Sequence, residues 1–218
     1  MITGGPTSSN PGPKSPSHVL SNMEDPAKEI RGVVLQITTA SSPDQQKKAI
    51  EAYMTPDVGF RHPICAVESA PESRKTVLGI YQWYRILSPY TVLRVDNVVW
   101  DKENNTVLLD IVQWFKLFFL PIQAAPARLL TRLTLRKEGD LYFIATQEDF
   151  YHPEDFFALL LPPLTPLIQL FLLITGFISS LYAKFSHFLG YWRPSDMDSE
   201  KLSPDGPEDD LYTNTGRR

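Results

Sequence analysis

Residues 128–150 read RLLTRLTLRKEGDLYFIATQEDF, and this stretch decides the fold. Its first ten residues alternate between two faces, which is the two-residue period of a β-strand. Glu138-Gly139-Asp140 is a hairpin turn signal, and residues 141–150 supply the returning strand. Strands joined by a short turn pair in an antiparallel arrangement. The stretch therefore predicts a β-hairpin whose first strand turns four residues to one face: Leu129, Thr131, Leu133 and Leu135.

Two more strands are predicted immediately upstream. Residues 90–100 and residues 106–118 are extended in character, and the polar residues 101–105 between them form a turn. Asp110 shares one face of the second strand with Leu108 and Val112. The pattern therefore predicts a four-stranded meander that carries one carboxylate among apolar side chains.

Helices are predicted before these strands. Asp25-Pro26 begins the first helix, because a carboxylate can cap free amide groups and proline suits the first helical position. Ser42-Pro43 begins the second with a capping-box pattern, and residues 73–87 form the third. Helices followed by a meander indicate the α+β class, with the helices packed on one face of a curved antiparallel sheet.

Two short motifs point to a known family. Residues 58–63 read VGFRHP, and residues 147–153 read QEDFYHP. In this order of elements the chain resembles the nuclear transport factor two-like superfamily. The second motif, followed by an apolar tail, is similar to the fungal SigF-like branch. The resemblance implies a cone-shaped sheet against about three N-terminal helices, followed by a hydrophobic C-terminal helix. The superfamily contains isomerases, dehydratases, cyclases, transport adaptors and domains of no known activity, so the fold alone does not choose a function.

Composition and resemblance together divide the chain into four parts. Residues 1–24 are predicted to be a disordered arm rich in glycine, proline and serine, and residues 193–218 a disordered acidic tail. Residues 25–158 form the predicted folded domain. Residues 159–192 form a hydrophobic segment that we expect to anchor the chain to a membrane.

The membrane prediction depends on residues 156–183, which contain no charged residue. Residues 167–183 are an unbroken run, and a spanning helix needs roughly 17–25 mostly apolar residues. The run is apolar on every side, and such a helix must be buried in protein or in lipid. The residues predicted to contact lipid are Leu167, Leu170, Phe171, Leu173, Ile174, Phe177, Ile178 and Leu181.

Two other interpretations of this segment stay open at this stage. The segment could be a helix that closes the cone of the domain, or an in-plane anchor bent at Pro162, Pro163 and Pro166. Because residues 1–22 contain no apolar run of the signal-peptide type, we expect the folded domain in the cytosol. The chain is expected to be a single-pass or monotopic membrane protein. The endoplasmic reticulum is the favoured organelle.

A second apolar stretch, residues 114–121, reads WFKLFFLP. Phe118, Phe119 and Leu120 cannot all face inward on one strand, because successive side chains alternate. Either this loop folds back over the core, or it dips into the bilayer surface.

A cone-shaped sheet usually encloses a pocket, so inward polar residues are the candidates for chemistry. Buried in an apolar pocket, Asp110 would have a raised pKa and could act as an acid or base. The alternative for Asp110 is an ion pair with Arg94 or Arg132. Weaker catalytic candidates are Tyr53, Tyr84 and His62, and the expected pocket residues are Trp83, Asp110, Trp114 and Arg132. No motif assigns a catalytic role to any of them.

Several classes of function are excluded or disfavoured by composition. The net charge of −4 does not favour binding to nucleic acid, which typically requires a basic surface. One cysteine, Cys65, and four histidines in no standard ligand spacing predict no metal site. The sequence contains no phosphate-binding or dinucleotide-binding motif, and we expect no cofactor. The expected partners are the lipid bilayer and an apolar small molecule, and homodimerisation is left open.

Three functions remain after these exclusions. The first is a membrane-anchored binding module for an apolar molecule, a lipid or a protein partner. The second is an isomerase, dehydratase or cyclase acting on a membrane-soluble substrate. The third is a structural adaptor with a filled core.

Overall fold

The computed structural model describes residues 23–191. The predicted acidic tail and nearly all of the predicted N-terminal arm lie outside these residues. The chain forms two compact units, one ending at Ile168 and the other beginning at Gln169.

Three helices precede most of the sheet, as predicted: α1 (Pro26–Thr38), α2 (Pro43–Tyr53) and α3 (Ser73–Leu87). The predicted cap of α2 is present, because the Ser42 hydroxyl accepts the N–H of Gln45 at 3.2 Å. The predicted cap of α1 is wrong in detail. The Asp25 carboxylate pairs with Lys28 at 2.7 Å, and the Glu29 carboxylate instead accepts the free N–H groups of residues 24 and 25.

The Ser42 cap provides a test of local helix stability. Ser42→Ala is expected to lower the free energy of unfolding by about 1 kcal/mol, because the first turn of α2 loses its side-chain acceptor. Urea denaturation followed by circular dichroism would measure the change. Ser42→Asp retains an acceptor and should cost much less, so equal losses for the two variants would contradict the capping role.

The sheet has six strands in the order β2-β1-β6-β5-β4-β3. Neighbouring strands are antiparallel except for β1 and β6, which run parallel. This confirms the predicted α+β class with a curved sheet, and adds a parallel pair that joins the first strand to the last. The strands are β1 (Met54–His62), β2 (Cys65–Val67), β3 (Val92–Asp101), β4 (Thr106–Trp114), β5 (Pro126–Glu138) and β6 (Leu141–Phe150).

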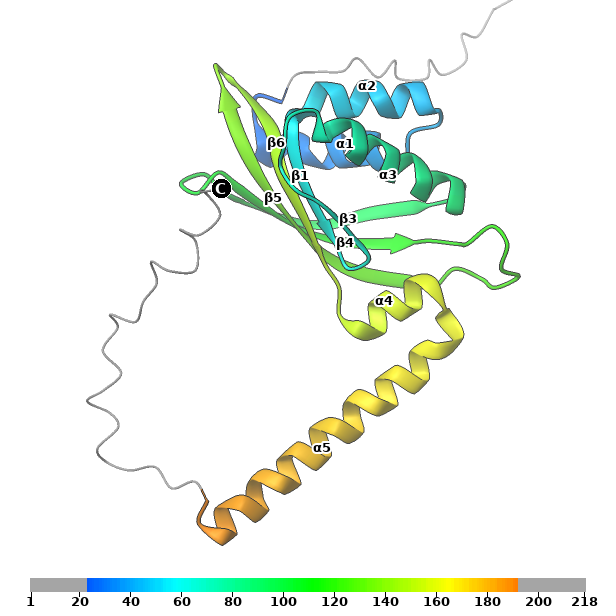
Figure 1. Cartoon of the computed structure of the whole chain (residues 1–218), viewed down its shortest axis with the longest axis vertical. Helices are drawn as coiled ribbons and strands as arrows, with labels where there is room; N and C mark the ends of the chain where they lie inside the picture. Colours follow the sequence, from blue (N-terminus) through cyan, green and yellow to red (C-terminus); the bar gives the residue numbers. More distant parts are fainter. Residues whose placement is uncertain (1–22, 192–218) are drawn as a thin grey trace, which may run out of the picture. The chain divides into compact units, whose positions relative to one another are not determined.

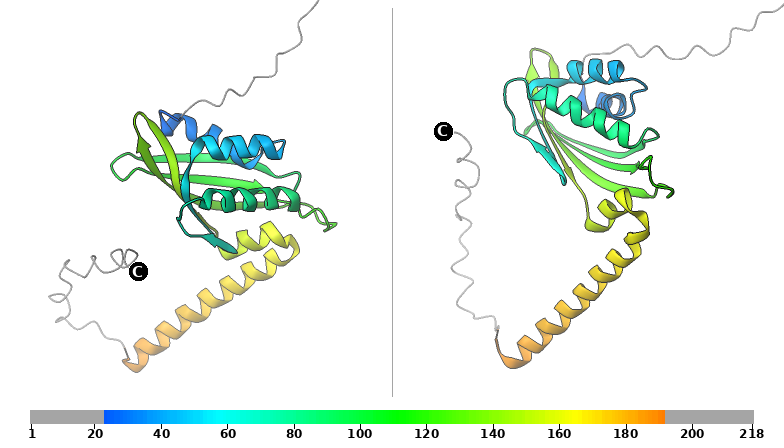
Figure 2. Two further views of the ribbon diagram at one scale, coloured as in Figure 1. Left: turned by 45° about the horizontal axis from the view of Figure 1, so that its top comes forward. Right: turned by 45° about the vertical axis from the view of Figure 1, so that its right-hand side comes forward.

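Helices α1, α2 and α3 cover one face of the sheet (Figures 1 and 2). The core lies between these helices and the covered, concave face. On β5 the buried residues are the predicted alternate set, and the residues between them are more exposed. The predicted face of this strand is therefore confirmed.

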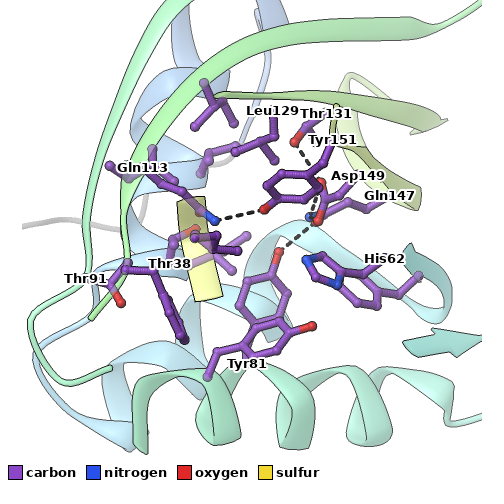
Figure 3. A pocket seen from close by; sticks show the side chains of 18 of the residues that line it. Thr38, His62, Tyr81, Thr91, Gln113, Leu129, Thr131, Gln147, Asp149 and Tyr151 are labelled. Atoms are coloured by element: carbon purple, nitrogen blue, oxygen red, sulfur yellow. Dashed lines mark hydrogen bonds between the residues drawn. The ribbon is translucent and has the colours of Figure 1, made fainter. Parts of the chain in front are cut away.

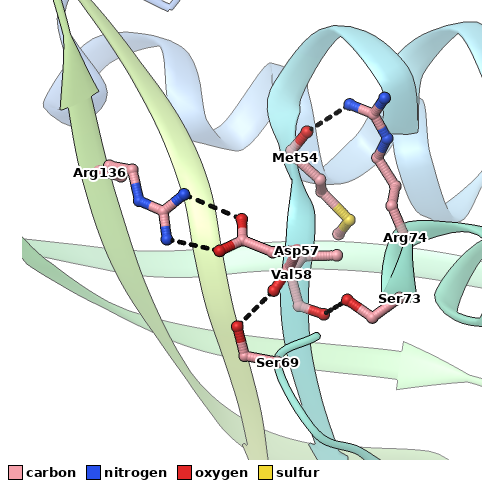
Figure 4. A network of polar contacts seen from close by, with 7 residues as sticks. All are labelled: Met54, Asp57, Val58, Ser69, Ser73, Arg74 and Arg136. Atoms are coloured by element: carbon pink, nitrogen blue, oxygen red, sulfur yellow. Dashed lines mark hydrogen bonds and ion pairs between the residues drawn. The ribbon is translucent and has the colours of Figure 1, made fainter. Parts of the chain in front are cut away.

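Polar contacts fix β1 at the edge of the core (Figure 4). The Arg136 guanidinium donates two hydrogen bonds of 2.9 Å to the Asp57 carboxylate, and it lowers the pKa of that carboxyl to about 2. Ser73, the first residue of α3, donates to the carbonyl of Val58 at 2.7 Å. Arg74 donates to the carbonyl of Met54 at 2.9 Å. These bonds tie β1 both to α3 and to the sheet.

The sheet is followed by α4 (Pro153–Leu160), a 3-10 turn (Pro162–Leu164) and α5 (Thr165–Leu189). Ala158 and Leu159 of α4 are buried against Phe115 and Ala127. The hydrophobic segment predicted to begin at residue 159 therefore starts with a residue, Leu159, that packs in the folded domain.

Helix α5 has a different character. The helical stretch Pro162–Leu189 has 28 residues, its most apolar 18-residue window has a mean hydropathy of 1.9, and none of that window is buried. It is long and apolar enough to cross a membrane. All eight residues predicted to contact lipid are exposed.

Candidate functional site

A cavity of about 90 Å³ lies between the concave face of the sheet and helices α1, α3 and α4 (Figure 3). One water molecule needs roughly 10–15 Å³ of such space, so the cavity has room for several waters or a small organic group. Its walls are mainly aliphatic and aromatic, with a few polar groups. Such a combination is typical of small-molecule sites. The polar lining residues at its centre are Tyr81, Gln113, Thr131, Gln147, Asp149 and Tyr151.

Asp149 is the acidic group at the centre of the cavity. Thr131 donates to its Oδ1 at 2.7 Å, and the Gln147 amide nitrogen lies 3.2 Å and 3.1 Å from its two oxygens. Tyr81 in turn donates to the Gln147 carbonyl oxygen at 2.7 Å. The hydroxyl of Tyr81 is thereby linked to the Asp149 carboxyl through one amide (Figure 3).

Burial determines the protonation of this group. Removal from bulk water raises the pKa of Asp149 to about 6, although the hydrogen bonds from Thr131 and Gln147 act in the opposite direction. Burial also raises the pKa values of Tyr81 and Tyr151, and the negative charge of Asp149 adds to both shifts. The carboxyl therefore changes protonation close to neutral pH, while both phenols keep their protons.

A bulge in β6 turns Asp149 inward. Thr134 pairs with Thr146 and Leu135 with Ile144, so Ala145 has no partner on β5. Tyr142 and Ile144 face the core before the bulge, and strict alternation would then bury Phe150 and expose Asp149. The extra residue reverses this, because it shifts all later side chains to the other face. Phe150 is accordingly exposed, and Asp149 faces the cavity.

His62 and Tyr84 lie at another wall of the cavity. The imidazole faces the rings of Tyr84 and Tyr151, with centroid distances of 5.5 Å and 5.4 Å. Burial lowers the pKa of His62 to about 4, so the ring is neutral at neutral pH. The Tyr84 hydroxyl lies 3.3 Å from the Cys65 sulfur, and burial raises the pKa of this phenol.

Comparison with known proteins assigns the family. A model of the SigF NTF2-like domain matches residues 23–191, which is the whole of the described region. This chain belongs to the SigF NTF2-like family. The superfamily predicted from the sequence is thereby confirmed. A search of curated proteins found no match for this SigF NTF2-like chain.

Several solved structures are similar to the SigF NTF2-like domain. A Jannaschia protein described as a SnoaL-like polyketide cyclase has a TM-score of 0.46 and 17% identity, and the match covers 61% of this chain and 92% of that one. A Catenulispora acidiphila protein with a ketosteroid isomerase-like fold has a TM-score of 0.42 and 14% identity, covering 58% and 90%. An M. tuberculosis LEH-like epoxide hydrolase has a TM-score of 0.46 and 10% identity, covering 66% and 99%. Likeness at this level does not choose a function for this chain.

The structure does not place the predicted pocket residues of the SigF NTF2-like domain in the cavity. Asp110, Trp114 and Arg132 lie on the outer face of the sheet, opposite the cavity. Arg132 approaches Glu148 at 3.8 Å, and the Arg94 guanidinium lies 5.7 Å from the centre of the Trp114 ring. Trp83 is exposed on α3.

The placement of Asp110 follows from strand parity. Its neighbours Leu109 and Ile111 face the core, so Asp110 faces solvent on the opposite side. The predicted acid or base at Asp110 is therefore wrong in position. The predicted alternative is also not observed, because Arg94 pairs with Asp96 and Arg132 approaches Glu148.

The weaker catalytic candidates divide between two environments. His62 and Tyr84 line the cavity, whereas Tyr53 is fully buried within the core. Sequence reasoning missed Asp149 as a pocket residue, because its inward direction depends on the bulge. Within residues 23–191, no group of three or more histidine, cysteine, aspartate or glutamate side chains converges to hold a metal ion.

Proposed function

We propose that this chain is a membrane-anchored binding domain that holds a small apolar molecule in its cavity. The observation that carries the proposal is the cavity itself, which is walled by apolar side chains around the partly buried carboxyl group of Asp149. A cavity of this kind suits a mostly apolar ligand with one oxygen or nitrogen atom near Asp149. It also argues against a structural adaptor with a filled core.

The anchor in this proposal is α5. An exposed helix whose most apolar 18-residue window has a mean hydropathy of 1.9 would be costly to keep in water, whereas hydrocarbon solvates it favourably on all sides. The motif at residues 147–153 followed by this helix supports a place in the fungal branch of the family. A cytosolic domain, the endoplasmic reticulum membrane and a homodimer stay predictions.

A matched pair of variants on β5 tests the binding function. Leu129 is 7% exposed and lines the cavity, whereas Leu130 is 39% exposed and faces outward. Leu129→Phe is expected to fill the cavity at a stability cost of about 1–3 kcal/mol, and Leu130→Phe should leave the cavity unchanged.

The measurement is native mass spectrometry and lipid extraction of the full chain, purified from membranes in mild detergent. We expect an apolar molecule to accompany the wild-type chain and the Leu130→Phe variant, and to be depleted from the Leu129→Phe variant. Equal recovery from both variants would place any bound molecule elsewhere, and no molecule on the wild type would count against binding.

A second function is favoured by the protonation of Asp149. A carboxyl with a pKa of about 6 inside an apolar cavity is suited to general acid or base catalysis near neutral pH. This property supports an isomerase, dehydratase or cyclase acting on a membrane-soluble substrate. The two functions differ in one outcome: an enzyme should yield a different extracted molecule when Asp149→Asn blocks turnover, whereas a binding module should retain the same one.

A further inference from the structure

Four apolar side chains are exposed where the last turn of α3 meets the loop between β4 and β5. We call this set, Ile86, Tyr90, Phe118 and Phe119, the lip. Phe118 is 64% exposed and Phe119 is 59% exposed, and their rings contact each other edge to face at 5.2 Å. Exposed apolar surface that gathers in one place marks an interaction site more often than scattered residues do.

The loop that carries the lip is held in place by its backbone. The N–H of Phe118 donates to the Leu87 carbonyl at 2.9 Å, and the N–H of Lys116 donates to the Ser88 hydroxyl, also at 2.9 Å. Phe115, one residue earlier, is buried. The two phenylalanines therefore stay outward although the base of their loop is packed against the core. Phe118 and Phe119 therefore do not fold back over the core, which was the first of the two alternatives for this loop.

The charge around the lip favours a negatively charged surface. Residues 73–95 and residues 111–137 contain no aspartate or glutamate, and these ranges include the whole lip. Arg85 directly precedes Ile86, and Lys116 lies two residues before Phe118. Aromatic rings with neighbouring basic side chains are typical of the membrane interface, where the rings enter the headgroup region and the cations meet lipid phosphates.

The chain itself brings the lip near a bilayer. Leu159 of α4 packs in the same cluster as Phe115, at the base of the lip loop. Leu161 and Leu164 follow α4 and are exposed, and α5 begins at Thr165. An anchor formed by α5 therefore brings the residues after α4 to the bilayer surface. The last turn of α3, the loop after β4 and α4 all lie at one end of the domain (Figures 1 and 2).

The cavity reaches the same end of the domain. Arg85, Leu87 and Thr91 line it, and each is within one residue of a lip residue. Leu159 and Leu160 of α4 line it as well. An apolar molecule leaving the bilayer beside the lip would meet the cavity wall without crossing bulk water.

We propose that the lip is a second bilayer contact of this protein, and that apolar ligands enter the cavity between the lip and α4. This inference rests on the proposed function, because it requires that α5 anchors the chain. It adds a defined surface and a route of entry. The lip contacts the headgroup region of a membrane that contains anionic lipid.

Fluorescent labels on the full chain test the lip. A Cys65→Ser background accepts an environment-sensitive nitrobenzoxadiazole label at Phe119→Cys, at Tyr90→Cys or at Asn104→Cys. Asn104 lies in the exposed turn between β3 and β4 and is the control. The labelled chains are reconstituted in vesicles of phosphatidylcholine and phosphatidylserine that contain nitroxide-labelled lipid as a quencher.

We expect quenching of the labels at residues 119 and 90 to be at least about threefold stronger than quenching of the label at residue 104, because interfacial segments enter roughly 5–10 Å into the bilayer. The two lip labels lie in different loops, so the test does not depend on the folding of one variant. Flotation of the same samples separates the two proposals. A chain that floats with vesicles while all three labels are quenched equally would overturn the lip and leave the anchor intact. A chain that does not float would overturn both.

Discussion

Asp149→Asn is expected to remove a pH dependence of stability: between roughly pH 4 and pH 7 the wild-type chain should lose about 2.4 kcal/mol of folding free energy relative to the variant. The folded state raises the pKa of this carboxyl from 3.8 to about 6, so the folded chain binds the proton more tightly than the unfolded chain. The stability that this proton contributes is present below pH 3.8 and is lost as the pH rises through 6. Asparagine carries no charge at any of these values, so the variant escapes the loss.

The difference between wild type and variant is the quantity to measure, by urea denaturation in mild detergent at several pH values. His62 makes this necessary, because burial lowers its pKa from 6.5 to about 4, and its contribution is lost as the pH falls through that range. Taking the difference removes the histidine contribution. Asp110→Asn, on the exposed outer face, should change stability by less than about 0.5 kcal/mol and is the control. A difference for Asp149→Asn that does not vary with pH would show that this carboxyl does not titrate in the predicted range.

Arginines in the middle of α5 are expected to release the chain from membranes. Leu173 and Phe177 are both exposed and lie one turn apart. An arginine at the centre of a spanning helix costs about 2.5–3.5 kcal/mol on insertion scales, so Leu173→Arg with Phe177→Arg should cost about 5–7 kcal/mol. We expect the double variant to move from the membrane pellet to the supernatant after high-speed centrifugation of lysed cells without detergent.

Position along the helix provides the control for this experiment. Phe188→Arg with Leu189→Arg adds the same charge near Lys184, at the end of the helix, where long basic side chains can reach headgroups. This variant should stay in the pellet. If the wild-type chain is found in the supernatant, or if both double variants behave alike, then α5 is not a membrane anchor.

Much of the fold follows from local patterns along the chain. The alternation on β5, the bounds of α3 and the Ser42 cap are confirmed, because each depends on interactions between residues close in sequence. The apolar character of α5 is likewise a property of its own residues. Strand β4 ends at Trp114 instead of residue 118, because the chain turns there to tie its next residues to the end of α3.

The sequence by itself determined the class of the fold, the greater part of its elements and the one long apolar helix, because periodicity and hydropathy are carried by neighbouring residues. Only the tertiary structure decided which carboxyl enters the cavity. Asp110 and Asp149 both lie on strands with apolar neighbours, but the register of β4 turns the first outward and the bulge at Ala145 turns the second inward. Pairing with the neighbouring strand sets that register, and the alternation within a single strand does not encode it.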